Sequence, residues 1–253
     1  MKQSFILWLS AVIITFLVGY AQRISSIDYP VSGTIDLKEG SFSFSFDKIA
    51  RTKSGYKAWI VSDFAGLKGS LLWRHKGDSE WQTIAMTDTG KALYAIIPQQ
   101  VPLSQIEYRA KVFNKNKTYL VPVESNVPLT FLNPVPDEIN QFYFITLFAG
   151  LILSIRAALE SFSDKPKIKR LAVFTTISFF SYTLVFNTVK KAVEIGAIGK
   201  GGVPLTDIFD MRSVLLFAVS IITMLLIFNT KKQKLWASAG AIITVLVFLF
   251  AKY

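Results

Sequence analysis

Two groups of charged residues lie at the ends of apolar segments, and they are the residues best placed to do chemistry in this chain. Arg156 and Glu160 are four residues apart, so on a helix both lie on one face. Asp207, Asp210 and Arg212 come just before a later apolar segment. A cation and a carboxylate at such a position can form an ion pair or dock a partner, so these five residues are the candidate contact sites.

Both groups also have a structural interpretation that needs no partner. At the end of a membrane span, Arg156 and Glu160 would extend to the water interface and neutralise each other. Asp207 and Asp210 would lie in the first turn of a helix that Thr206 caps, where carboxylates suit the positive end of the helix dipole. We expect the interface and helix-capping roles. The more specific hypothesis is that these charged residues also contact the polar domain or a partner protein.

The residue types that most catalytic and metal sites need are missing. The chain has no cysteine and one histidine, His75, which stands beside a predicted turn. This excludes thiolate nucleophiles, iron–sulfur clusters and bis-histidine haem. No HExxH motif is present, and 199–202 lacks the spacing of a phosphate-binding loop. We therefore predict no catalytic residue, no metal, no cofactor, and a protein that is not an enzyme.

Five apolar segments must position the charged residues. Each is close to the roughly 20 residues that a helix needs to cross a bilayer, and the four C-terminal ones have no charged residue at their centres. They lie at Phe5–Tyr20 and at about Phe142–Leu159, Leu171–Val189, Val214–Phe228 and Leu235–Phe250. The pattern predicts an N-terminal anchor or cleavable signal over 1–22 and a four-span domain over 139–253.

The distribution of charge predicts the orientation and excludes nucleic acid as a partner. Of 28 basic residues, 14 lie within 22–140 beside 12 acidic ones, while the remainder of the chain has 14 basic and 5 acidic residues. The excess is concentrated in the links 160–170 and 230–234, which marks them as cytoplasmic. The expected location is a bacterial inner membrane, with the lipid bilayer as a partner and the polar domain in the periplasm.

The polar stretch 28–133 predicts an exported all-β domain. The run Ser41–Phe46 alternates serine and phenylalanine, which is typical of a strand with one buried face. Six more strands are expected at Tyr56–Val61, Ser70–Arg74, Trp81–Met86, Ala92–Ile97, Ile106–Phe113 and Thr118–Val123. Seven short strands in about 100 residues are typical of an immunoglobulin-like or fibronectin-like sandwich. We expect its aromatic residues Trp59, Trp73, Trp81 and Tyr108 to be core or rim anchors, and a carbohydrate or peptide platform is the alternative.

Small residues follow one face of the second apolar segment. Gly150, Ser154 and Ala158 are spaced at i, i+4 and i+8, which allows two helix backbones to approach closely. We predict that they serve helix packing within the chain.

Six short segments of the chain match a known pattern: 69–74, 81–86, 95–98, 106–109, 154–160 and 205–207. Through them the chain resembles a family of uncharacterised bacterial inner-membrane proteins, in which an exported β-sandwich precedes a small helical membrane domain. The resemblance covers most of the chain after the first apolar segment, and Ala158 departs from it where glycine is expected. It implies the architecture and no particular chemistry.

The sequence thus predicts an α+β membrane protein: a transmembrane anchor, an extracytoplasmic sandwich and a four-helix transmembrane domain. The leading hypothesis for its role is a non-enzymatic membrane subunit whose periplasmic sandwich binds or scaffolds other envelope proteins. The alternatives are a component of a membrane transporter and a sensor that binds a ligand on its sandwich.

Overall fold

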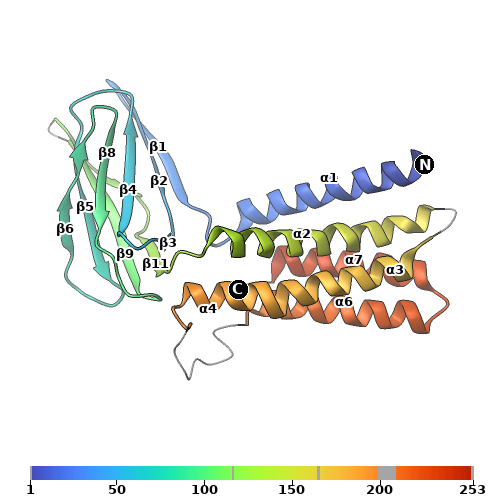
Figure 1. Cartoon of the computed structure of the whole chain (residues 1–253). Coiled ribbons are helices and arrows are strands. Elements are labelled where there is room, and N and C mark those ends of the chain that lie inside the picture. The colour runs from blue at the N-terminus through green and yellow to red at the C-terminus, as the bar shows by residue number, and fades with distance from the viewer. Residues whose placement is uncertain (1, 116, 164–165, 199–208, 252–253) are drawn as a thin grey trace. The chain divides into compact units, whose positions relative to one another are not determined.

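The computed structural model describes residues 2–115, 117–163, 166–198 and 209–251 (Figure 1). It confirms an α+β fold, with two β-sheets in the N-terminal half and long apolar helices. The chain forms two compact units. The sheet unit comprises 27–134 with Glu194–Gly196, and the helical unit comprises 1–26, 135–193 and 197–253.

The sheet unit contains a five-stranded and a six-stranded sheet. The five-stranded sheet has the order β1 (Val31–Leu37), β2 (Gly40–Phe46), β4 (Tyr56–Ser62), β8 (Ala92–Ile97), β7 (Thr87–Asp88). The six-stranded sheet has the order β3 (Ile49–Arg51), β11 (Val127–Leu132), β9 (Gln105–Asn114), β5 (Lys68–His75), β6 (Gln82–Ala85), and β10 (Lys117–Val121) also pairs with β9. The described strand pairs are antiparallel, apart from the parallel pair of β3 and β11.

Strands of both sheets contribute to one hydrophobic core. Side chains alternate between the two faces of a strand, so every second residue of β4, from Tyr56 to Ser62, is buried. In β2 the same period buries Phe42 and Phe46. The six-stranded sheet contributes fully buried Leu71 and Tyr108 to this core.

The helical unit holds the described α-helices, apart from Glu194, which belongs to the sheet unit. They are α1 (Lys2–Ser25), α2 (Asp137–Leu159), α3 (Ile168–Phe180), α4 (Thr188–Glu194), α6 (Met211–Asn229) and α7 (Gln233–Phe250). A 3₁₀ turn at Glu160–Phe162 follows α2, and a π-helical segment, Ser181–Asn187, joins α3 to α4. Within the described residues, five helices are long and apolar enough to cross a membrane, with α3, the π-helical segment and α4 counting as one.

Helix α2 packs against α1, α3 and α7, and α6 packs against α3 and α7 (Figure 1). The loops after α2 and after α6 lie at one end of the unit, since Lys234 Nζ donates to the Ser161 carbonyl at 2.9 Å. The first turn of α1 lies at the same end, because Gln3 Nε2 donates to the Phe162 carbonyl at 2.8 Å. We call this the basic end for its exposed residues Lys167, Lys169, Arg170, Lys231, Lys232 and Lys234.

Candidate functional site

An aromatic pair lies on the outer face of the five-stranded sheet. Trp59 on β4 and Tyr94 on β8 are directly opposite each other in the antiparallel register, and their ring centroids are 5.2 Å apart. Trp59 is 41% exposed. Lys57, two residues before Trp59 and therefore on the same face, places Nζ 4.0 Å from the Trp59 ring centroid and 3.9 Å from that of Tyr94. Such a cation–π contact holds the two rings and the ammonium group together.

Two aliphatic side chains extend this surface. Val61 follows Trp59 on the outward face of β4 and is 53% exposed, and Ile96 lies opposite Lys57 on β8 and is 46% exposed. We call Lys57, Trp59, Val61, Tyr94 and Ile96 the Trp59 patch. A contiguous outward surface of aromatic and β-branched residues with one cation has the composition of a recognition surface.

The four expected anchor aromatics divide between the core and the surface. Trp73 and Tyr108 belong to the core, at 4% and 0% exposed. Trp59 lies on the outer face of its sheet, and Trp81 is partly exposed just before β6. The guanidinium carbons of Arg74 and Arg109 lie 4.6 and 4.9 Å from the Trp81 ring centroid. Trp81 is thus enclosed by two cations of its own unit and is less open to a partner than Trp59.

Two buried tyrosines connect the sheets inside the unit. The hydroxyls of Tyr56 and Tyr108 are 3.0 Å apart, Tyr108 also donates to the Asp47 carbonyl at 2.8 Å, and Tyr56 accepts from the Asp47 amide at 2.9 Å. Burial raises the pKa of Tyr108 well above its usual value, and the neighbouring Tyr56 hydroxyl adds to the rise. Burial also raises the pKa of Tyr56. Both groups are therefore neutral hydrogen-bonding partners.

In the helical unit, Arg156 and Glu160 form an ion pair, with Arg156 Nη1 donating to Glu160 Oε2. Glu160 Oε1 also accepts from the backbone amide of Lys167 at 2.9 Å. The two residues are 4% and 3% exposed, and their ion pair confirms the predicted mutual neutralisation. Side chains of α1 and of the start of α3, Trp8 and Leu171 among them, line the same pocket as the pair.

The ion pair lines an open pocket of about 450 Å³ at the basic end. We call it the basic pocket. Residues of α1, α2, α3 and the connection between the last two line it: Ser4, Trp8, Leu153, Arg156, Glu160, Ser163, Lys167, Arg170, Leu171 and Phe174.

Asp210 is the N-cap of α6, and its Oδ1 accepts from the Ser213 amide at 2.8 Å. This corrects the expectation that Asp210 lies in the first helical turn after a cap at Thr206. Thr206 and Asp207 lie outside the described residues. Arg212 is 6% exposed and its Nε donates to the Ala251 carbonyl at 3.1 Å, so it is engaged inside the unit.

A buried polar network surrounds Asp210. Asn187, at the end of the π-helical segment, donates from Nδ2 to Asp210 Oδ2 at 2.6 Å, and Thr183 Oγ1 donates to the Ser213 carbonyl at 2.9 Å. Asn187 and Thr183 are each 1% exposed. This network was not predicted from the sequence, although Asn187 near the end of an apolar segment is the signal that could have indicated it.

The three small residues of α2 face different neighbours. A Cβ on Gly150 would lie 2.7 Å from the Phe179 ring, so Gly150 contacts α3. Ser154 faces a central cavity, and Ala158 lines a shallow groove against α7. Each step of four residues turns a helix by about 40° beyond a full circle, which separates positions that are eight residues apart.

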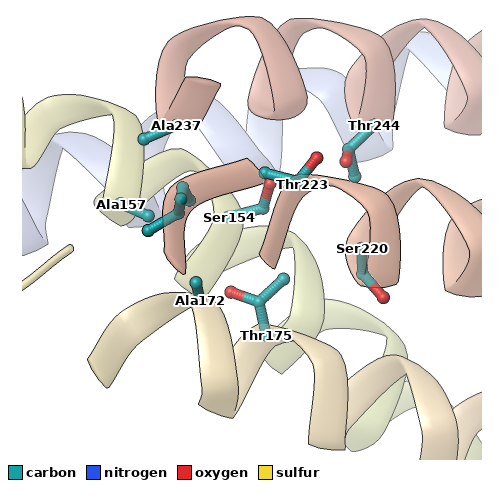
Figure 2. A pocket seen from close by; sticks show the side chains of 9 residues that line it. Ser154, Ala157, Ala172, Thr175, Ser220, Thr223, Ala237 and Thr244 are labelled. Carbon is teal, nitrogen blue, oxygen red and sulfur yellow. The ribbon is translucent and has the colours of Figure 1, made fainter. Parts of the chain in front are cut away.

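The central cavity is small and lined with hydroxyl groups. Side chains of α2, α3, α6 and α7 converge on it, among them Ser154, Thr175, Ser220, Thr223 and Thr244 (Figure 2). Its volume of about 20 Å³ leaves room for one water molecule. Thr175 and Ser220 already donate to carbonyls of their own helices, at 2.9 and 2.7 Å.

Within the described part of the chain, no group of three or more His, Cys, Asp or Glu side chains is placed to hold a metal ion.

Comparisons with known proteins give little. No protein-family model matches the chain, and no curated protein matches it. One solved structure similar to it is a β-1,2-glucanase from Parabacteroides distasonis, with 11% identity and a TM-score of 0.23. The match covers 86% of this chain and 34% of the glucanase, so the chain spans about a third of that protein's length. A likeness of this size carries no argument about function.

The similar solved structure is that of an enzyme, and the prediction that the chain is not an enzyme is set aside. No catalytic residue or substrate is transferred to this chain from it.

Proposed function

We propose that this chain is a multi-pass protein of a bacterial inner membrane that presents the sheet unit in the periplasm to bind another envelope protein. The proposal takes the sheet unit as an immunoglobulin-like or fibronectin-like sandwich and the five long helices as membrane spans. Two observations support membrane insertion. The helices have suitable length and hydropathy, and the first turn of α1 lies at the same end as both basic loops. That end is the cytoplasmic side under the positive-inside rule.

The Trp59 patch is the observation that carries the binding role. Tryptophan and tyrosine contribute disproportionately to protein–protein affinity, because they bury large areas with few rotatable bonds. Val61 and Ile96 add apolar area at both ends of the pair. Lys57 supplies one positive charge above the rings, which favours a partner with an acidic side chain at the matching position.

A ligand sensor could use the same aromatic pair, and the position of Lys57 is the observation that bears on the choice between the two roles. A sugar stacks on an open ring face, whereas here the Lys57 ammonium group lies about 4 Å from both ring centroids. A protein partner can instead contact the lysine, the ring edges and the aliphatic flanks together. The patch therefore favours a protein over a glycan.

The transporter alternative finds little support in the described helices. A conduit needs a polar path, whereas the cavity shared by α2, α3, α6 and α7 has room for one water molecule.

Site-specific photo-crosslinking in cells tests the binding role. A photoreactive amino acid replaces Val61 or Ile96 in the full-length protein, and the same residue at Leu120 on β10 is the matched control, since Leu120 is 39% exposed outside the patch. We expect one defined protein adduct from positions 61 and 96 and not from position 120. The variant W59A/Y94A, combined with a crosslinker at position 61, should abolish that adduct. Equal adducts at all three positions, or an adduct indifferent to W59A/Y94A, would contradict the proposal.

A further inference from the structure

We propose that the basic pocket at the end of the helical unit binds the phosphate headgroup of an anionic phospholipid. The inference rests on the proposed membrane insertion and is independent of the partner-binding role of the sheet unit. It names a ligand class for a site of the helical unit.

The described lining of the pocket carries more positive than negative charge. Among the residues that the structure describes, Arg156, Lys167 and Arg170 line it together with one acid, Glu160. That acid is already occupied, since its two oxygens accept from the Arg156 guanidinium and from the Lys167 backbone amide. Within the described ranges, the side chains of Lys167 and Arg170 form no ion pair, and both residues are exposed. Two cations are therefore available to an anion in the pocket.

Arg156 is a buried donor with unused capacity. Its residue is 4% exposed, and the one hydrogen bond its guanidinium makes to the described residues is the bond to Glu160. Its Nε is buried and has no hydrogen-bond partner there. A guanidinium has five N–H donors, and leaving buried donors unpaired is costly. A phosphate oxygen is the acceptor that the planar fork of arginine suits best, and Ser163 adds a hydroxyl to the same pocket.

The apolar walls distinguish a phospholipid from a free phosphate. Trp8, Leu171 and Phe174 line the same pocket as the cations, and Trp8 is 39% exposed. A volume of about 450 Å³ far exceeds what a bare phosphate fills. A ligand with a negatively charged head and an apolar tail satisfies both kinds of lining. The pocket lies at the end assigned to the cytoplasm, where the leaflet is rich in anionic headgroups.

Native mass spectrometry of the full-length protein in a neutral detergent tests whether the basic pocket binds an anionic phospholipid. The protein is titrated with phosphatidylglycerol, with phosphatidylcholine of the same acyl chains, and with inorganic phosphate. The variant K167Q/R170Q removes two charges that line the pocket, and K231Q/K232Q removes two exposed charges from the same end outside it. We expect K167Q/R170Q to weaken phosphatidylglycerol binding about tenfold or more, and K231Q/K232Q to leave it within about twofold.

Three results would overturn the proposal: equal binding of the two lipids, equal losses in both double variants, or full competition by inorganic phosphate at millimolar concentration. The last would indicate a free-anion site. Unfolding temperatures in detergent check that each variant is folded, and R170Q alone serves as the test if the double variant is not. Because the readout is lipid bound to purified protein, failure here leaves the crosslinking result at the Trp59 patch unaffected.

Discussion

Tyr56 and Tyr108 show how one buried residue pair can connect two sheets. Tyr56 lies on β4 of the five-stranded sheet and Tyr108 on β9 of the six-stranded sheet, and both hydroxyls bond to the backbone of Asp47. Each hydroxyl would be costly to bury alone, and the shared hydrogen bonds remove that penalty. The pair therefore links the two sheets by hydrogen bonds as well as filling space in the core.

This arrangement predicts a loss of stability in alkali. Burial raises the pKa values of Tyr108 and Tyr56 in the folded state above the usual value near 10. Above about pH 10 the unfolded chain loses these protons while the folded chain keeps them. The stabilisation that the two neutral tyrosines contribute is therefore complete below pH 10 and is lost as the pH rises further. Thermal unfolding of the full-length protein in detergent, at pH values from about 8 to 11.5, measures this loss of stability.

The variant Y56F/Y108F should unfold at a lower temperature at pH 8, with a shallower fall above pH 10, because phenylalanine cannot ionise. Y119F, which removes a hydroxyl outside the pair, is the control and should keep the wild-type slope. A wild-type slope in Y56F/Y108F would exclude the pair as the source of the alkaline loss.

The sequence alone does not show whether an aromatic side chain points into the core or toward solvent. In Tyr56–Ser62 both alternating sets are largely apolar, so the pattern does not decide whether Trp59 or Ile60 is buried. The structure buries Ile60 and exposes Trp59, whereas Trp73 on β5 is buried. The Arg156–Glu160 pairing follows directly from the i, i+4 spacing, but its burial depends on α1, which is far away in the sequence.

At the scale of elements, the strands with clear alternation were predictable and the irregular ones were not. All seven expected segments contain strands in the structure. Four described strands were not predicted. They are β1, in which Gly33 and Asp36 weaken the pattern, β11, in which Pro128 argues against a strand, and the short strands β3 and β7. The π-helical segment was not predicted either, because an apolar run has the same hydropathy in an α-helix and in a π-helix.

The contact of α6 with α7 depends on a missing side chain. A Cβ on Gly240 of α7 would lie 2.4 Å from Cγ2 and Oγ1 of Thr223 on α6. G240A should therefore destabilise the helical unit by about 1–3 kcal/mol through overpacking. Thermal unfolding in detergent measures the effect.

A second variant shows whether the clash is the cause. T223A removes both close atoms, so T223A/G240A should be more stable than the sum of the two single changes predicts. Strictly additive effects would mean that the glycine is needed for another reason, such as helix geometry.

The whole molecule combines a sheet unit that carries the Trp59 patch with a helical unit that has apolar helices and one basic end. The five apolar segments and the two basic links were visible in the sequence, because span length and lysine content are local properties. The Trp59 patch and the basic pocket were not, since each brings together residues from separate segments. The two proposed binding sites thus depend on tertiary structure, whereas the length and hydropathy of the candidate spans depend on local sequence.

The claim that the sheet unit is presented outside the cytoplasm is tested most directly by cysteine accessibility. The chain has no cysteine, so single replacements give an unambiguous signal. S45C places a thiol on an exposed position of β2, and K231C places one in the loop between α6 and α7. With a membrane-impermeant maleimide on spheroplasts, we predict that S45C is labelled at once and that K231C is labelled only after the membrane is permeabilised. Labelling of K231C on sealed spheroplasts, protection of S45C, or recovery of the protein in the soluble fraction would contradict the account.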